Sequence, residues 1–310
     1  MRVSVVVATY QRAGRLPGLV AALEAQTLPR GEFEVVISDD GSADETPAVL
    51  AGLVARSGLD LRVVRMPRNG GAGAARNLGW RAARAPVVAF TDDDCLPAPG
   101  WLEAGLARLD SSGAGIVQGR TLPDPAATLD PEYARSQSLE TFTKRYETCN
   151  IFYRTDVLRA TSGFDESIYF FGEDTDLGWR AKDRGVTTDF APEALVHHEV
   201  TRKTVRYLWR FSMQHRNWAT LVRRHPEMRK EILIYRVFIK RVHVGFLAAV
   251  AGAIVAPFWL PGLALAVPYV WHRRPRALKE IAAPFWNTLF DGLVLGALVV
   301  GSVRERTLVL

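Results

Sequence analysis

Short runs of β-branched residues alternate with amphipathic helical runs through the first hundred residues of this chain. The runs expected to form strands are almost continuously apolar, which is typical of a parallel sheet covered by helices on both faces. We therefore expect an α/β fold with a mostly parallel sheet. The expected strands are Val3–Ala8, Glu34–Ser38, Leu61–Met66 and Val87–Thr91, and the expected helices are Leu16–Gln26, Thr46–Ser57, Ala74–Arg84 and Trp101–Leu109.

Polar residues follow every one of these strands. The loops begin with Thr9–Arg12, Asp39–Ser42, Arg68–Gly71 and Asp92–Asp94. The carboxyl ends of parallel strands meet at one edge of a sheet, and ligands of open α/β sheets bind beyond that edge. We expect the functional site there.

The pattern weakens after this region. Residues 119–144 are rich in proline and are expected to form a long excursion, and order returns with a strand at Asn150–Arg154 and a helix that begins near Glu173. Residues 203–241 look helical and strongly basic, because they hold 11 Lys and Arg against 2 Glu.

Two apolar runs lie in the C-terminal third. Val244–Trp271 contains 28 residues without a charge, which exceeds the roughly 20 needed to enter a bilayer. Prolines interrupt it, so a kinked span and a re-entrant pair of short helices both fit. The basic stretch His272–Lys279 favours re-entrance, because it prefers the cytosolic side. The second run, Pro284–Val303, contains Asp291, and a buried helix of a soluble protein is the alternative for either run.

Charge is distributed unevenly along the chain. Residues 1–201 carry 21 Lys and Arg against 28 Asp and Glu, whereas residues 202–310 carry 18 against 5. The basic part adjoins the uncharged run, so we expect it to meet anionic lipid headgroups and not nucleic acid. Two cysteines are too few for a disulfide framework, and no signal peptide is visible, so we expect a cytosolic N-terminal part.

The sequence FTDDDC places three carboxylates directly after an apolar strand. In an extended chain Asp92 and Asp94 point to one side and Asp93 to the other. Paired carboxylate oxygens at a sheet edge suit Mg²⁺ or Mn²⁺. A solvated acidic turn, or a cap for the helix that begins at Trp101, is the alternative.

Several motifs in order resemble an inverting, metal-dependent glycosyltransferase of family 2 with the GT-A fold, of the membrane-associated bacterial type. The matching segments run from Val3 to about Glu199 and read VSVVVATYQRAGRLPGLVAAL, EVVISDDGSADET, RNGGAGAARNLGWRAA, AFTDDDC, TCNIFYRTDVL, GFDE, FGEDTDLGWRAKDRG and APEALVHHE. The resemblance implies a nucleotide-diphosphate sugar as donor and inversion at the anomeric carbon.

The resemblance also implies which residues bind the donor. Asp40 matches the carboxylate that accepts a hydrogen bond from a pyrimidine N3–H, which favours a UDP- or dTDP-sugar. Asp92 and Asp94 match the metal-binding pair, and His198, not His197, matches the metal-binding histidine. The remaining donor-binding candidates are Thr9, Tyr10, Asn69, Arg76, Asn77 and Asp93. The alternatives are purely structural: an Asx-turn for Asp40, tight helix packing for the glycine-rich loop and a structural role for the histidine.

Asp174, beside Glu173, matches the family's catalytic base, and neighbouring carboxylates would raise its pKa into a useful range. The alternative is that these acids only favour the N-terminus of their helix. Asn150 and Asp165 match the wall on the acceptor side. Cys95 stands where relatives often carry an acidic residue, and we expect no functional role for it.

Together these features predict three parts: a GT-A catalytic domain over residues 1–202, a basic helical linker over 203–241 and hydrophobic membrane-associated helices over 242–310. The expected activity is sugar transfer to a lipid-linked or glycan acceptor at the cytoplasmic face of the cell membrane, in cell-envelope polysaccharide or glycolipid synthesis. A non-catalytic scaffold that binds sugar nucleotides is the alternative, although such a scaffold should have lost the acidic motifs. A nucleotidyltransferase is disfavoured because the loop after the first strand lacks lysine.

Overall fold

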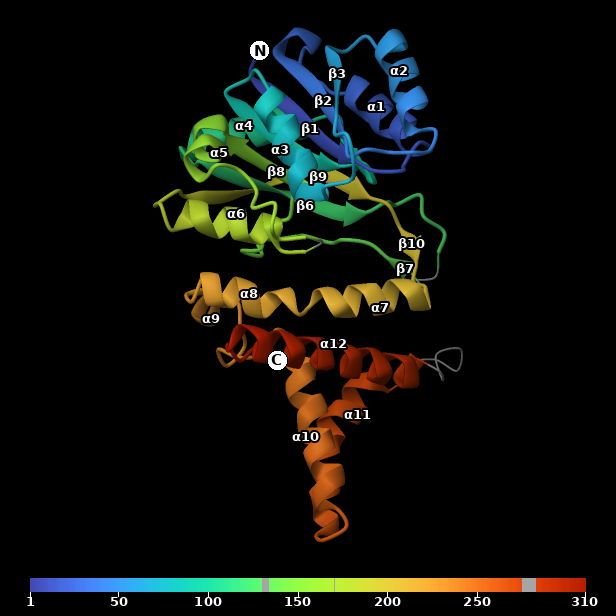
Figure 1. The fold of residues 1–310 in the computed structure, drawn as a ribbon, viewed down its shortest axis with the longest axis vertical. Coiled ribbons are helices and arrows are strands. Elements are labelled where there is room, and N and C mark those ends of the chain that lie inside the picture. Colours follow the sequence, from blue (N-terminus) through green and yellow to red (C-terminus); the bar gives the residue numbers. More distant parts are fainter. Residues whose placement is uncertain (130–133, 170, 275–282) are drawn as a thin grey trace. The chain divides into compact units, whose positions relative to one another are not determined.

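The computed structural model describes residues 1–129, 134–169, 171–274 and 283–310. They form two compact units, one made of residues 1–129 and 135–201 and the other made chiefly of residues 202–310. Figure 1 shows that the first unit is a twisted sheet with flanking helices and that the second consists mainly of helices.

The sheet of the first unit is mixed. Among the described residues, eight strands form it in the order β3-β2-β1-β4-β8-β6-β9-β5. The first four run parallel, β8 is antiparallel to β4 and β6, β9 is parallel to β6, and β5 is antiparallel to β9. The strands are β1 (Val3–Thr9), β2 (Phe33–Asp39), β3 (Leu61–Arg65), β4 (Val87–Asp92), β5 (Cys95–Pro97), β6 (Ile116–Pro123), β8 (Asn150–Arg154) and β9 (Thr188–His198).

Every strand and helix expected in the first hundred residues is present, with strand ends within one residue and helix ends within three of the expected positions. The helices of this unit are α1 (Leu16–Glu24), η1 (Arg30–Glu32), α2 (Thr46–Arg56), α3 (Ala72–Ala82), α4 (Trp101–Ser112), α5 (Thr155–Thr161) and α6 (Glu173–Lys182), and the two-residue strands β7 (Ala134–Arg135) and β10 (Thr201–Arg202) lie outside the main sheet.

The expected excursion from residue 119 is wrong in its first part, because Ile116–Pro123 forms the interior strand β6. Buried polar side chains hide the apolar pattern of this strand. The Gln118 amide donates to the backbone oxygens of Glu147 and Asn150, at 3.0 and 2.7 Å. These bonds satisfy its NH₂ group although the residue is buried.

Two glycines bring helices close to the sheet. A Cβ on Gly79 of α3 would lie 2.5 Å from a methyl carbon of Val6 on β1, and a Cβ on Gly105 of α4 would overlap the ring of Phe152 on β8. The missing side chains allow α3 and α4 to pack closely against the sheet. The close packing of α3 on β1 brings the loop before α3 to the edge of the sheet.

The second unit contains α7 (Val205–Gln214), α8 (Asn217–Arg224), α9 (Met228–Glu231), α10 (Arg241–Val255), η2 (Leu260–Ala266), α11 (Val267–Arg273) and α12 (Ala283–Glu305). The basic stretch is thus helical only up to Glu231, and Ile234 and Phe238 pair instead as an isolated bridge. The first apolar run folds as short helical segments and not as one kinked span. Of the expected basic loop His272–Lys279, residues 275–279 lie outside the described residues.

The second apolar run forms α12. Among the described residues, Pro284–Glu305 is the one helix that is long and apolar enough to cross a bilayer by length and composition alone, and 33% of its most apolar stretch is buried within the structure.

Candidate functional site

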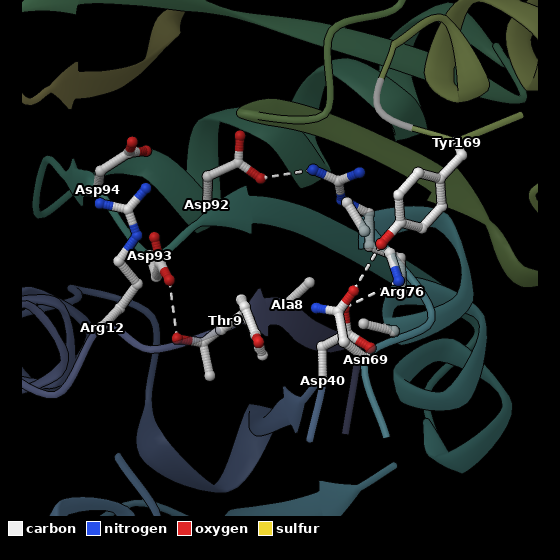
Figure 2. A pocket seen from close by; sticks show the side chains of 14 residues that line it. Ala8, Thr9, Arg12, Asp40, Asn69, Arg76, Asp92, Asp93, Asp94 and Tyr169 are labelled. Atoms are coloured by element: carbon white, nitrogen blue, oxygen red, sulfur yellow. Dashed lines mark hydrogen bonds and ion pairs between the residues drawn. The ribbon is translucent and has the colours of Figure 1, made fainter. Parts of the chain in front are cut away.

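A cavity of about 350 Å³ opens at the carboxyl edge of the parallel strands (Figure 2). Its lining comes from the ends of β1, β2 and β4 and the loops that follow them, from the loop before α3, from the start of α3 and from one residue of a later loop. The lining residues are Ala8, Thr9, Tyr10, Arg12, Asp40, Asn69, Gly71, Ala72, Ala75, Arg76, Asp92, Asp93, Asp94 and Tyr169.

The register of the sheet explains this gathering. Thr9 on β1 pairs with Asp39 on β2, and Ala8 pairs with Asp92 on β4, so the three strands end at the same level. Eight of the residues expected from the sequence line the cavity, and these are Thr9, Tyr10, Asp40, Asn69, Arg76, Asp92, Asp93 and Asp94.

Asp40 organises the glycine-rich loop. Its carboxylate accepts hydrogen bonds from Asn69 Nδ2 at 2.9 Å and from the backbone N–H groups of Gly70 and Gly71 at 2.7 and 2.9 Å. Burial raises the pKa of Asp40, and the two backbone donors act against that rise. A carboxylate has about four acceptor positions, so about one remains for a ligand.

Arg76 joins three elements behind the cavity wall. Arg76 is 7% exposed, and its guanidinium donates to Asp92 at 2.8 Å and to Glu173 at 2.9 Å. Burial by itself would lower the pKa of Arg76, but these two carboxylates hold it above its ordinary value, so the charge persists. Both terminal nitrogens therefore face carboxylates, and Arg76 also lines the cavity.

The three aspartates after β4 do not alternate as expected. The strand ends at Asp92, and Asp93 and Asp94 form a turn, so all three line the cavity. Asp93 accepts a hydrogen bond from Thr9 Oγ1 at 2.7 Å. Burial, followed by repulsion from Asp94 and Asp92, raises the pKa of Asp93 to about 7.

His198 lies next to Asp94, because Cys95 on β5 pairs with His198 on β9. The His198 Nε2 atom is 3.5 Å from Asp94 Oδ1. On the other side of the ring, Nδ1–H donates to the Glu199 backbone oxygen at 2.8 Å, and Ser136 Oγ lies 3.3 Å from the same nitrogen. This bond leaves the Nε2 lone pair facing Asp94, which is the usual arrangement of a metal-binding histidine.

The donor set fits a hard or borderline divalent ion. Ligand atoms of Asp94, Cys95 and His198 lie within 4.8 Å of one another. Burial raises the pKa of the Cys95 thiol well above its ordinary value, so this group stays protonated and is a poor metal ligand. The remaining carboxylate and imidazole suit Mn²⁺ or Mg²⁺ better than a metal that prefers thiolates.

Asp174 lies in the first turn of α6, half-buried and one residue after the Glu173 partner of Arg76. Burial raises its pKa well above the ordinary value, and the charges of Glu173 and Glu147 raise it further, while Arg76 acts in the opposite direction. Such an environment gives this carboxylate a higher proton affinity than an exposed aspartate, which suits a group that accepts a proton.

Besides Glu173, Asp174 and His198, three expected residues lie outside the cavity lining. Asn77 is 1% exposed and exchanges hydrogen bonds with Trp80, Phe164 and Glu166. Asn150 is fully buried, with its amide bonded to Arg120, Ala194 and Trp101. Asp165 accepts from the backbone N–H of Ser167 at 2.9 Å. The first two hold elements together behind the site.

Sequence reasoning missed Arg12 and Tyr169. Figure 2 shows the Arg12 guanidinium beside Asp93 and Asp94, and its position in the loop after β1 was a usable signal. Tyr169 donates to Asn69 Oδ1 at 2.7 Å, and its ring lies 2.8 Å from where a Gly71 Cβ would be. No local pattern marks it, because its partners lie about a hundred residues earlier.

Comparison with known proteins identifies the family. The sequence profile of glycosyl transferase family 2 matches residues 4–164, and that of glycosyl transferase family group 2 matches residues 87–299. The chain belongs to glycosyl transferase family 2. Glycosyltransferase AglE of Haloferax volcanii is 30% identical over 205 residues, which cover 63% of this chain and 66% of that protein.

The pre-mycofactocin glycosyltransferase of Mycobacterium tuberculosis is 31% identical over 245 residues, 75% of this chain and 50% of that protein. The chain thus spans about two thirds of the first relative's length and half of the second's. Among solved structures, mannosyltransferase PcManGT of Pyrobaculum calidifontis, in complex with GDP-Man and Mn²⁺, has a TM-score of 0.62 at 18% identity, covering 98% of this chain and 86% of that one. Residues 1–349 of S. aureus TarS, with UDP-GlcNAc, have a TM-score of 0.54 at 19% identity, covering 99% and 93%. The fold is GT-A.

Proposed function

We propose that this family 2 protein transfers a sugar, with inversion, from a nucleotide-diphosphate sugar to an acceptor hydroxyl. The observation that carries the proposal is a set of charged groups near one edge of the sheet. Asp94 lies beside His198, and Arg76 joins Asp92 to Glu173, the residue directly before Asp174. A non-catalytic scaffold would have no need of a carboxylate with a raised pKa beside such a set.

Different residues of the site are proposed to bind different parts of the donor. Asp40 accepts an imide N–H of the base through its remaining acceptor position, while Thr9, Tyr10 and Asn69 line the base and ribose region. Asp92, Asp94 and His198 would hold Mg²⁺ or Mn²⁺, and the bound ion would supply positive charge to neutralise the diphosphate. Asp93 adds a further carboxylate beside Thr9.

Asp174 is the proposed base. It removes the proton from the acceptor hydroxyl as that oxygen attacks the anomeric carbon opposite the departing nucleotide. Burial, Glu173 and Glu147 keep its proton affinity high. Asp165, on the loop that leads to α6, is proposed to contact the acceptor.

The donor is proposed to be a UDP- or dTDP-sugar, because a carboxylate acceptor selects the imide of uracil or thymine. Structures of similar fold hold UDP-GlcNAc in one case and GDP-Man with Mn²⁺ in another, so a screen should include UDP, dTDP and GDP. The acceptor is proposed to be lipid-linked or a glycan at the cytoplasmic face of the cell membrane, in envelope polysaccharide or glycolipid synthesis. The basic and apolar composition of residues 202–310 supports that location.

The test is Asp174→Asn, measured for transfer and for Mn²⁺-dependent nucleotide binding. We expect turnover to fall by at least about a hundredfold, the usual contribution of a general base. Nucleotide binding should stay within about twofold, because Asp174 is not part of the cavity lining. Asp183→Asn, an exposed carboxylate at the other end of α6, is the matched control. Unchanged turnover in Asp174→Asn would remove the base from the proposal.

A further inference from the structure

The first apolar run forms a helical hairpin. Helix α10 runs outward, and η2 and α11 return along it, as Figure 1 shows. The two arms touch at glycines: a Cβ on Gly252 would lie 2.6 Å from the Gly262 carbonyl oxygen, and a Cβ on Gly245 would lie 3.6 Å from Tyr269. Backbones this close pack without intervening side chains, so the hairpin is a built element and not a broken span.

The tip of the hairpin is apolar and exposed. Phe258 is 91% exposed, Leu260 69%, Trp259 60% and, one turn before them, Ile254 67%. Large side chains gathered in this way leave a contiguous apolar surface in water, which soluble monomers rarely carry without a partner.

The base of the hairpin is basic. Lys240 and Arg241 begin the outgoing arm and Arg274 follows the returning arm, so the fold brings these three charges to the same end, while the charge of Arg273 is paired with Asp291. The Arg274 guanidinium lies 3.3 Å from the ring centroid of Trp271, which is itself 68% exposed. An apolar tip below an aromatic and basic belt is the side-chain order of a membrane interface that carries anionic headgroups.

The length of the hairpin matches one leaflet. Helix α10 has 15 residues, or about 22 Å at about 1.5 Å each. The hydrocarbon core of a bilayer is about 30 Å thick, and each headgroup region adds about 5–8 Å. One arm therefore reaches through the headgroups and about half of the core before the chain turns back.

Helix α12 does not supply a crossing, because it packs against the arginine-bearing helices α7 and α8. Glu305 accepts from Thr220 at 3.1 Å and from Arg223 at 3.0 Å, and a Cβ on Gly301 would overlap the Arg216 carbonyl. A transmembrane α12 would draw these arginines into hydrocarbon. At its other half, the buried Asp291 pairs with Arg273 and accepts from Tyr269 at 2.8 Å, which fixes α12 to the hairpin base.

We propose that residues 241–273 insert as a hairpin into a single leaflet of an anionic bilayer, with the Phe258–Leu260 tip in the hydrocarbon and neither end of the hairpin crossing the membrane. The inference rests on the membrane location given in the proposed function and specifies how the chain binds the membrane. Its test requires no transfer activity, so that failure of one leaves the other intact.

The first measurement is flotation of the full chain with phosphatidylcholine vesicles that contain phosphatidylglycerol. The double variant Phe258→Ser/Leu260→Ser should bind at least about tenfold more weakly, because it removes the inserted apolar surface. Val54→Ser, which changes a 43% exposed apolar residue of α2, should bind like the unaltered protein. Equal binding by all three proteins would overturn the proposal.

The second measurement places the tip. Phe258→Cys gives a usable label, because the native Cys95 and Cys149 are both buried. In vesicles this thiol should resist a membrane-impermeant maleimide added outside or enclosed within, and should react once detergent is added. Reaction from inside would show a crossing, and reaction from outside at the rate of the free protein would show no insertion. If the serine double variant turned a dimer into a monomer and left flotation unchanged, the apolar tip would be an interface with a second copy of the chain. Each of these results overturns the proposal.

Discussion

At the scale of single residues, the site depends on carboxylates placed near one another. Glu147 is partly buried and accepts from Thr143 Oγ1 at 2.9 and 2.7 Å, and its removal from solvent raises its pKa. Its charge also raises the pKa of Asp174, after burial and Glu173, whereas Arg76 lowers it. The proton affinity of the proposed base is therefore set by residues that need not touch the substrate.

Changing Glu147 to Gln should move the acid limb of the pH–rate profile. A base works when deprotonated, so turnover rises as pH passes through its pKa. Removal of the Glu147 charge lowers the pKa of Asp174, and the rise should therefore occur at lower pH. The measurement is kcat against pH, with the exposed Glu140→Gln as control. A limb that stays in place, or moves to higher pH, would contradict this account of the base.

At the scale of elements, the sequence predicted the parallel half of the sheet and its loops because those patterns are local. The sequence predicted that Thr9, Asp40 and Asp92 lie at one edge of the sheet, because the loops after parallel strands meet there. Contacts across the chain could not be predicted in that way. Glu173, which pairs with Arg76, is 97 residues away from it in sequence. Asn150 was expected in the wall on the acceptor side, and its sequence context gave no sign that its amide donates to the backbone oxygens of Arg120 and Ala194 in distant strands.

Arg76 links α3, β4 and α6, and Arg76→Met should expose that role. The change leaves Asp92 and Glu173 without their shared cation, which for a buried pair costs about 3 kcal/mol. Urea unfolding measures the loss. Arg81→Met on the same helix, 3.7 Å from Glu166 and half exposed, should change stability by less than about 0.5 kcal/mol. Equal effects of the two substitutions would show that the bridge does not stabilise the fold.

At the scale of the whole molecule, charge and apolar surface are divided along the chain. The excess of acidic residues falls within residues 1–201 and the basic excess within residues 202–310. The sequence left a kinked span and a re-entrant pair open, because proline interruptions fit both. The contact between Gly252 and Gly262 supports the proposed hairpin, and it involves glycines that carry no periodic signal.

This division predicts how salt acts on membrane binding. Each Lys or Arg near an anionic surface contributes about 1 kcal/mol, and the Debye length falls from about 10 Å at about 0.1 M salt to about 3 Å at about 1 M. Raising NaCl over that range should weaken binding to phosphatidylglycerol vesicles by about thirtyfold, which corresponds to the loss of two such contacts. Binding to pure phosphatidylcholine vesicles should change little, because burial of the Phe258–Leu260 tip is not electrostatic. Equal salt dependence for both vesicle types would mean that the basic hairpin base does not face the headgroups.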